Sequence, residues 1–302
     1  MGLPRRKASS LDAKIHTKGT DSFSPPYPHY AAGPTLPPCQ AQLRCQNTTH
    51  DGGGHIPPPR QGWEKIFEEV CGTFLFLTRG IDGGILPALS ALASQQAQPT
   101  ANIMKLCKLF LDYMASQEEP ILTYKASDMV LAIHSDASYL SEPNARSRAG
   151  GHMFMSTNTD IPNNNGAVLN TSHIIQAVMS STAKAELGAL SINAKHAMSM
   201  RHTLNELGHS QPCMPNQTDN KNANDLLTNK IMPKALKAMD MHFHWLWCRD
   251  AQGQCRYYWR PGTQNLANYF TKHHPASHHK ASRPMYLTSP SDLSWWITPL
   301  LK

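Results

Sequence analysis

Three stretches with different patterns of hydrophobic and polar residues follow one another along the chain. Residues 1–60 hold ten of the 23 prolines and few branched apolar residues, so apolar side chains do not recur there at helix or strand spacing. This composition predicts a disordered tail. In residues 63–125 apolar side chains recur at helical spacing, which predicts a small helical subdomain whose second helix ends at Pro120. The periodic positions are Ile66, Val70, Phe74 and Leu77, followed by Met104, Leu106, Phe110 and Met114.

From Met129 onward the pattern becomes short apolar runs followed by one long helical period. Three runs with short connections predict an antiparallel meander of strands: Met129–His134, Gly150–Met155 and Ala167–Ser172. A helix is then expected from the N-cap residues Ser180, Ser181 and Thr182 to Leu207, with Gly208 as its C-cap glycine. Its predicted buried stripe consists of Leu187, Leu190, Ala194, Ala197, Leu204 and Leu207.

Helices and strands alternate in the remainder of this stretch. The predicted elements are a strand at Met214–Thr218, helices at Asn222–Asn229 and Lys234–Trp247, a strand at Cys255–Trp259 and a last helix at Gln264–Lys272. Strands first, then alternating helices and strands, predict an α/β fold with a mixed sheet and helices packed on it.

Composition narrows the class of protein without deciding its function. The 302-residue chain is 40% hydrophobic and carries a formal charge of +7, which permits an anionic partner such as nucleic acid. Its seven scattered cysteines form no C-x-x-C pair and indicate reduced thiols. No stretch approaches the roughly 20 apolar residues of a membrane span, and the N-terminus lacks an apolar signal-peptide core. We therefore expect an intracellular protein, cytoplasmic or nuclear, without membrane association.

Three acidic residues stand at positions where an α/β fold can gather side chains. Asp136 ends the first predicted strand, Glu186 lies in the first turns of the long helix, and Asp219 ends the fourth strand. Carboxylates that meet in one site need a cation, and Mg²⁺ or Mn²⁺ suits such hard oxygen ligands. Each residue also has a structural alternative. Asp136 suits a turn, Glu186 suits the positive end of a helix, and Asp219 suits an N-cap.

Six motifs in a fixed order resemble the ribonuclease H domain of Ty1/copia-type retrotransposon polyproteins. They cover some 140 residues, within a domain at about 129–280. The segment 63–125 resembles the connection between reverse transcriptase and ribonuclease H, residues 281–302 would be a C-terminal tail, and residues 1–60 match no known pattern. The motifs are SDASY at 135–139, RAGG at 148–151, SSTAKAELGAL at 180–190, TDN at 218–220, KAMDMHFHW at 237–245 and RPGTQNLANYFTK at 260–272.

The resemblance implies a fold, a reaction and a ligand set. The fold would be a ribonuclease H-like mixed five-stranded sheet, three antiparallel strands then two parallel, flanked by helices. The reaction would be two-metal hydrolysis of the RNA strand of an RNA–DNA hybrid, with two Mg²⁺ or Mn²⁺ ions held by Asp136, Glu186 and Asp219. The family's fourth ligand is an Asp in the closing motif, where this chain has Asn268. Lys184 is a second departure, since the family usually has Glu there. We therefore expect weak metal binding and reduced or lost hydrolysis.

A basic stretch free of acidic residues extends from Asp250 to Asp292 and interleaves aromatic rings with cations. Such a surface suits a nucleic-acid backbone, although the strand aromatics also suit a core and the histidine run a solvated tail. The candidate nucleic-acid contacts are Arg148, Arg256, Arg260 and Lys272. No Tyr-x-Asp-Asp polymerase motif occurs. Besides a nuclease, the sequence permits a non-catalytic nucleic-acid-binding relic or a decayed product without function.

Overall fold

The computed structural model describes residues 62–97, 100–229 and 241–289. The predicted tail at 1–60, the start of the helix predicted from Lys234, and residues 290–302 of the predicted C-terminal tail lie outside the described residues.

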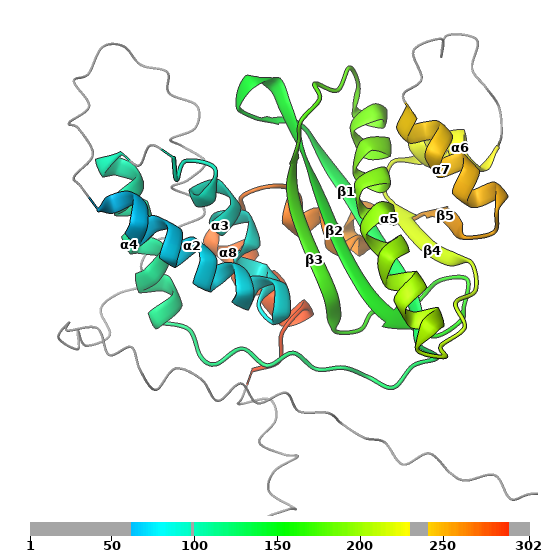
Figure 1. The fold of residues 1–302 in the computed structure, drawn as a ribbon, viewed down its shortest axis with the longest axis horizontal. Coiled ribbons are helices and arrows are strands. Elements are labelled where there is room, and N and C mark those ends of the chain that lie inside the picture. The colour runs from blue at the N-terminus through cyan, green and yellow to red at the C-terminus, as the bar shows by residue number, and fades with distance from the viewer. Residues whose placement is uncertain (1–61, 98–99, 230–240, 290–302) are drawn as a thin grey trace, which may run out of the picture.

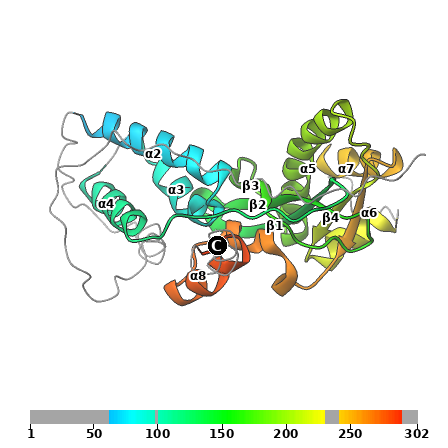
Figure 2. The same ribbon diagram turned by 90° about the horizontal axis from the view of Figure 1, so that it is seen from below.

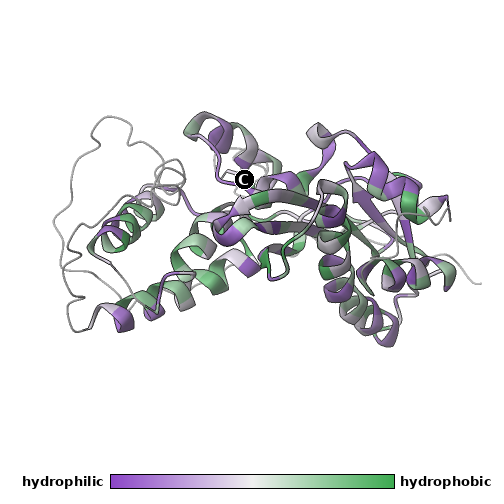
Figure 3. Cartoon of the chain, turned by 90° about the horizontal axis from the view of Figure 1, so that it is seen from above, coloured by the Kyte–Doolittle hydropathy of each residue, from purple (hydrophilic) through white to green (hydrophobic). Residues whose placement is uncertain are grey.

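A helical subdomain comes first among the described residues (Figure 1). It contains α2 (Trp63–Gly80), the short helix η1 (Gly83–Ile85), α3 (Leu86–Ala93) and α4 (Ala101–Ala115). Two of these helices match the predicted ones, whereas α3 was not predicted. Hydrophobic and hydrophilic residues alternate along α2 and α4 (Figure 3), whereas α3 is almost wholly apolar. Their core is formed by Phe67, Cys71, Ile85, Ala88, Leu89, Ala91, Leu92, Ile103, Leu106, Cys107 and Phe110.

The buried face of α2 differs slightly from the predicted stripe. Ile66 is 49% exposed, while its neighbour Phe67 is fully buried. Val70, Phe74 and Leu77 pack against the core only partly buried. The contact face is rotated because α3 packs on α2, and the sequence period of α2 gave no indication of that extra helix.

The sheet has five strands in the spatial order β3-β2-β1-β4-β5. Strands β1, β2 and β3 pair antiparallel, and β4 and β5 add parallel neighbours on the far side of β1. The prediction of a ribonuclease H-like mixed sheet, three antiparallel strands then two parallel, is confirmed. The strands are β1 (Val130–Glu142), β2 (Arg146–Ser156), β3 (Ala167–Ile175), β4 (Met214–Thr218) and β5 (Cys255–Trp259).

Helices cover both faces of this sheet (Figure 2). On one face α5 (Thr182–Glu206), α6 (Lys221–Thr228) and α7 (Met241–Ala251) share the main apolar core with the strands. Leu190, Ala194 and Ala197 are buried as predicted, but Leu207 is 69% exposed because α5 ends before it. Gly208 adopts the left-handed conformation, at φ +89°, that is expected of a C-cap glycine.

The other face carries short elements instead of the last α-helix predicted at Gln264–Lys272. The chain forms two 3₁₀ turns, η3 (Gly262–Gln264) and η4 (Leu266–Thr271). The unpredicted helix α8 (Ala276–Ser282) and the 3₁₀ turn η5 (Arg283–Met285) follow.

The end of the described chain packs back onto the helical subdomain. Arg283 forms an ion pair with buried Asp82 at 2.8 Å, and Thr288 pairs with Ile121 in a β-bridge. The first residues of the predicted C-terminal tail are therefore structured, and they join the helical subdomain to the sheet. Among the described helices, none has the length and apolar character needed to cross a bilayer.

Candidate metal centre

Strand register brings the first and third carboxylates together. β1 and β4 are parallel neighbours in which Ile133 pairs with Asn216. Asp136 and Asp219 each lie three residues further along and are therefore neighbours, Asp136 in the middle of β1 and Asp219 directly after β4. An oxygen atom from each of Asp136, Glu186 and Asp219 lies within 4.8 Å of the others. Three of the predicted ligands thus meet in one cluster.

The start of α5 delivers Glu186 to this cluster. Ser181 is the N-cap residue, and its hydroxyl accepts a hydrogen bond from the Lys184 N–H, as the sequence predicts. Glu186 is buried in the second turn and accepts hydrogen bonds from the Ala137 N–H at 3.2 Å and the Thr218 hydroxyl at 3.4 Å. Both flanking strands therefore fix the Glu186 carboxylate.

A threonine that sequence reasoning missed holds Asp136. The Thr271 hydroxyl donates to Asp136 Oδ2 at 2.7 Å, and Thr271 is buried at the end of η4. Thr271 belongs to the closing motif directly before Lys272. No sequence pattern indicates this hydrogen bond, because 135 residues separate the donor from the acceptor.

The electrostatics of the cluster call for a cation. Burial and the neighbouring Asp219 raise the pKa of Asp136 to about 6, although the Thr271 hydroxyl and Lys272 oppose this. Burial, then Asp136 and Asp219, raise the pKa of Glu186 well above its ordinary value, and burial also raises the pKa of Asp219. Close carboxylates resist ionisation in this way when no positive charge neutralises them. The all-oxygen donor set fits a hard divalent cation.

Asn268 lies on the same short segment as Thr271. Its side chain is half-buried, and its backbone carbonyl oxygen lies 2.9 Å from the Thr271 hydroxyl oxygen, where it competes with Asp136 for the single hydroxyl proton. The segment that would carry the fourth ligand is therefore adjacent to the cluster. Lys184, the other departure from the family pattern, is half-exposed at the start of α5.

The candidate nucleic-acid contacts fall into two groups. Lys272 is exposed beside the cluster, and its charge lowers the pKa of Asp136 and of Asp219. Arg256 and Arg260 are partly exposed, and the Arg256 guanidinium lies 5.6 Å from the centre of the Tyr258 ring. Arg148 contradicts the expectation, because it is only 1% exposed. Its guanidinium forms an ion pair with Glu142 inside the protein, at 2.6 Å, and has no access to a nucleic-acid backbone.

The aromatic and histidine residues of the basic stretch divide between core and surface. Cys255 and Tyr257 are buried while Arg256 and Tyr258 are only partly buried, which is the alternation expected of a strand with one covered face; Trp259, at the end of β5, is 43% exposed. His274 and His279 are buried, so the histidine run is not a solvated tail.

A cavity of about 570 Å³ lies between α2 and α3 on one side and β3 and α5 on the other. Its lining includes Arg79, His173 and His196 but none of the three carboxylates. The carboxylate cluster and this cavity are therefore separate features.

Comparison with known proteins identifies a similar transposon polyprotein. No family model matches the chain. The chain is 22% identical over 202 residues to the retrovirus-related Pol polyprotein from transposon TNT 1-94 of Nicotiana tabacum. This match covers 67% of the chain, which spans only 14% of the length of that polyprotein.

Two solved structures show weaker likeness. LC11-RNase H1 in complex with an RNA/DNA hybrid has 13% identity and a TM-score of 0.36, covering 47% of this chain and 93% of that one. The foamy viral protease-reverse transcriptase in complex with double-stranded DNA has 14% identity and a TM-score of 0.28, covering 70% of this chain and 36% of that one. The strand order and directions, rather than these likenesses, define the fold as ribonuclease H-like.

Proposed function

We propose that this chain is a retrotransposon-derived ribonuclease H module. It hydrolyses the RNA strand of RNA–DNA hybrids with two divalent ions, at a rate reduced by Asn268. The observation that carries the proposal is the convergence of Asp136, Glu186 and Asp219 within 4.8 Å, from three separate elements, on a ribonuclease H-like sheet. The similarity to a transposon polyprotein supports it.

Each residue of the cluster has a distinct task. Asp136, Glu186 and Asp219 would hold the ions, with Asn268 as a weaker fourth ligand. Bound Mg²⁺ or Mn²⁺ would supply the activation of a water molecule and the stabilisation of the leaving oxygen. Thr271 orients Asp136, while the Ala137 N–H and the Thr218 hydroxyl orient Glu186. Because metal binding requires the ionised carboxylates, it releases protons wherever their pKa values are raised.

Asn268 explains why we expect a reduced rate. An amide oxygen can coordinate a cation, but it lacks the negative charge and the bidentate option of a carboxylate. A divalent ion held with the help of Asn268 would therefore bind more weakly than one held by a carboxylate at that position.

Lysine and arginine side chains at the surface would bind the substrate. Lys272 lies beside the cluster, and Arg256 and Arg260 lie on and after β5. Neutralising phosphates with these side chains would release counterions, so hybrid binding should weaken steeply as salt is raised. Arg148 has no part in this surface because it is buried.

The decisive experiment is gel-resolved cleavage of a labelled RNA–DNA hybrid by the full chain in Mg²⁺ and in Mn²⁺. The natural protein is compared with Asn268→Asp, with Asp136→Asn as the inactive control. Asn158→Asp places the same new carboxylate at an exposed position in the β2–β3 loop and should leave the rate unchanged. We expect Asn268→Asp to raise the rate above that of the natural protein.

The absence of any effect of Asn268→Asp in an active protein would contradict the proposed ligand set. A second candidate function follows from the same residue, because loss of the fourth carboxylate favours a non-catalytic nucleic-acid-binding relic. Salt-dependent hybrid binding without cleavage by either protein would support that function. Failure to bind hybrid at low salt would exclude both.

A further inference from the structure

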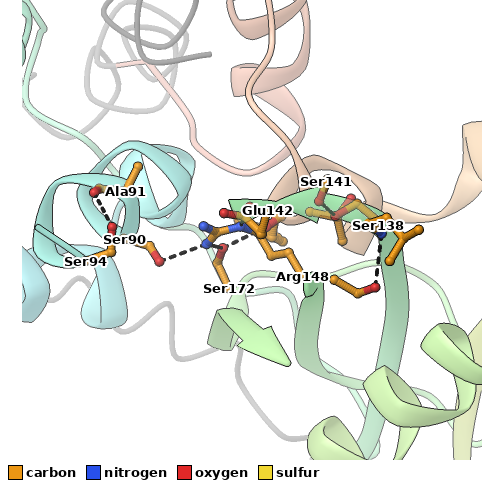
Figure 4. Close-up of polar contacts among 12 residues, drawn as sticks. Ser90, Ala91, Ser94, Ser138, Ser141, Glu142, Arg148 and Ser172 are labelled. Atoms are coloured by element: carbon orange, nitrogen blue, oxygen red, sulfur yellow. Dashed lines mark hydrogen bonds and ion pairs between the residues drawn. The ribbon is translucent and has the colours of Figure 1, made fainter. Parts of the chain in front are cut away.

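The buried Arg148 stands at the centre of a polar network that joins three parts of the fold (Figure 4). Its Nε donates to Glu142 Oε1 at 2.6 Å. Its Nη1 donates to the Ser90 hydroxyl of α3 at 2.8 Å and to the Ser172 hydroxyl of β3 at 3.0 Å. A buried guanidinium is costly unless its hydrogen bonds are satisfied. These contacts use its Nε–H and both N–H groups of Nη1, and they tie the helical subdomain to two strands of the sheet.

The network continues to the segment that carries Thr271. The Ser172 hydroxyl accepts from Arg148 and donates to the backbone carbonyl of Phe270 at 2.8 Å. Thr271 is the next residue, and its hydroxyl donates to Asp136 Oδ2. A short series of contacts therefore leads from Ser90 on α3 to the central carboxylate of the cluster.

The η4 segment needs such external support. It is a six-residue 3₁₀ stretch, and 3₁₀ hydrogen bonds have poorer geometry than those of an α-helix. It also lies directly on β2, because a Cβ atom added at Gly150 would meet the Ala267 carbonyl oxygen at 2.6 Å. Across this close contact, a small displacement of η4 moves the Thr271 hydroxyl away from Asp136.

The helical subdomain contacts η4 at a second point. The Tyr269 hydroxyl donates to the backbone carbonyl of Gly84 at 3.0 Å and also contacts the buried His279 ring. Tyr269 and Phe270 are adjacent in η4, so the subdomain and the network around Arg148 hold neighbouring residues of the same segment.

We propose that Arg148 is a positioning residue of the metal cluster. By way of Ser172 it holds η4 against the sheet, so that the Thr271 hydroxyl meets Asp136, and by way of Ser90 it makes the helical subdomain part of this support. As a statement about a metal ligand the inference rests on the proposed function; as a statement about η4 it stands independently. Arg148 would therefore act inside the protein and not as the nucleic-acid contact that its charge suggested.

The test uses serine substitutions, because removal of Arg148 would leave Glu142 buried without its partner and endanger folding. Ser172→Ala deletes the link to Phe270 and keeps the ion pair, and Ser90→Ala deletes the link to α3. Ser94→Ala is the matched control, because the Ser94 hydroxyl donates only within its own helix, to the Ala91 carbonyl (Figure 4). Hydrogen–deuterium exchange of the peptide 262–272 in the full chain is measured without metal, followed by Mn²⁺ affinity by calorimetry.

We expect Ser172→Ala to speed exchange of this peptide about fivefold, the factor that corresponds to the loss of one net hydrogen bond of about 1 kcal/mol. Ser90→Ala should produce a smaller increase in the same peptide, and Ser94→Ala none. Unchanged exchange in a folded Ser172→Ala protein would overturn the inference. Unchanged exchange in Ser90→Ala would remove the helical subdomain from it.

The Mn²⁺ measurement separates this inference from the proposed function. If the natural protein binds Mn²⁺, Ser172→Ala should weaken that binding about tenfold, as loss of support behind a metal ligand does. Unchanged Mn²⁺ affinity would show that Arg148 does not position Asp136. If the natural protein binds no Mn²⁺ while exchange responds as expected, the support of η4 stands and the proposed metal-dependent function fails.

Discussion

Replacing Asp136 with Asn should stabilise the metal-free protein at neutral pH. The pKa of Asp136 is raised from 3.8 to about 6, mainly because the carboxylate is buried and lies beside Asp219. The folded state therefore holds the proton more tightly than the unfolded state, and stability falls as pH rises from about 4 through about 6. A difference of about two in pKa corresponds to about 3 kcal/mol. Asn removes that cost and can still accept the Thr271 hydrogen bond.

The assay is urea denaturation of the full chain in a chelator, at pH 4 and at pH 7.5. At pH 7.5 we expect Asp136→Asn to raise the free energy of unfolding by up to about 3 kcal/mol. The gain should shrink towards zero at pH 4, because there Asp136 of the folded natural protein is already protonated. Asp160→Asn makes the same substitution at an exposed loop position and should change little at either pH. A gain at pH 4 as large as the gain at pH 7.5 would refute the electrostatic reasoning.

Two further predictions concern residues next to the carboxylates. Thr271→Val removes the donor to Asp136, so Mn²⁺ affinity measured by calorimetry should fall about tenfold, whereas Thr271→Ser should retain it. Equal losses in both variants would point to packing instead of the hydroxyl. Lys272→Gln removes an exposed cation beside the cluster. It should reduce the slope of log affinity for the RNA–DNA hybrid against log salt by about one, and an unchanged slope would exclude a phosphate contact.

The strands of the sheet were predictable because their signals are local. Apolar runs, turn residues and N-cap serines indicate where β1 to β5 and α5 lie, although β1 extends on to Glu142 and β2 begins already at Arg146. The parallel pairing of β1 with β4, and with it the convergence of Asp136 and Asp219, was expected from the resemblance to ribonuclease H and not from local signals. The helix expected at Gln264–Lys272 was wrong for a non-local reason. The η4 segment has an apolar composition suited to a helix, but its close contact with Gly150 and the cap from the Asn265 side chain to the Ala267 N–H hold it as tight 3₁₀ turns.

The burial of Arg148 could not be predicted from the sequence either. A basic residue in a chain of charge +7 suggests a solvated surface. Its burial depends on Glu142 across the β1–β2 hairpin, on Ser90 from another subdomain and on Ser172 from β3. Three partners brought together by tertiary packing cannot be identified from local pattern, and neither can the dependence of η4 on them.

The structure also decides between the alternatives that the sequence left open for the three carboxylates. Asp136 is not a turn residue, since it lies within β1 and pairs with Gly150 of β2. Asp219 is not the N-cap of α6, because Asn220 has that place and its side chain accepts from the Ala223 N–H. Glu186 is buried beyond the first turn of α5, where the helix dipole has little effect. Raised pKa values show that burial of these carboxylates opposes folding. The hydrogen bonds from Thr271, Thr218 and the Ala137 N–H offset part of this cost, and a bound divalent cation would offset more of it directly.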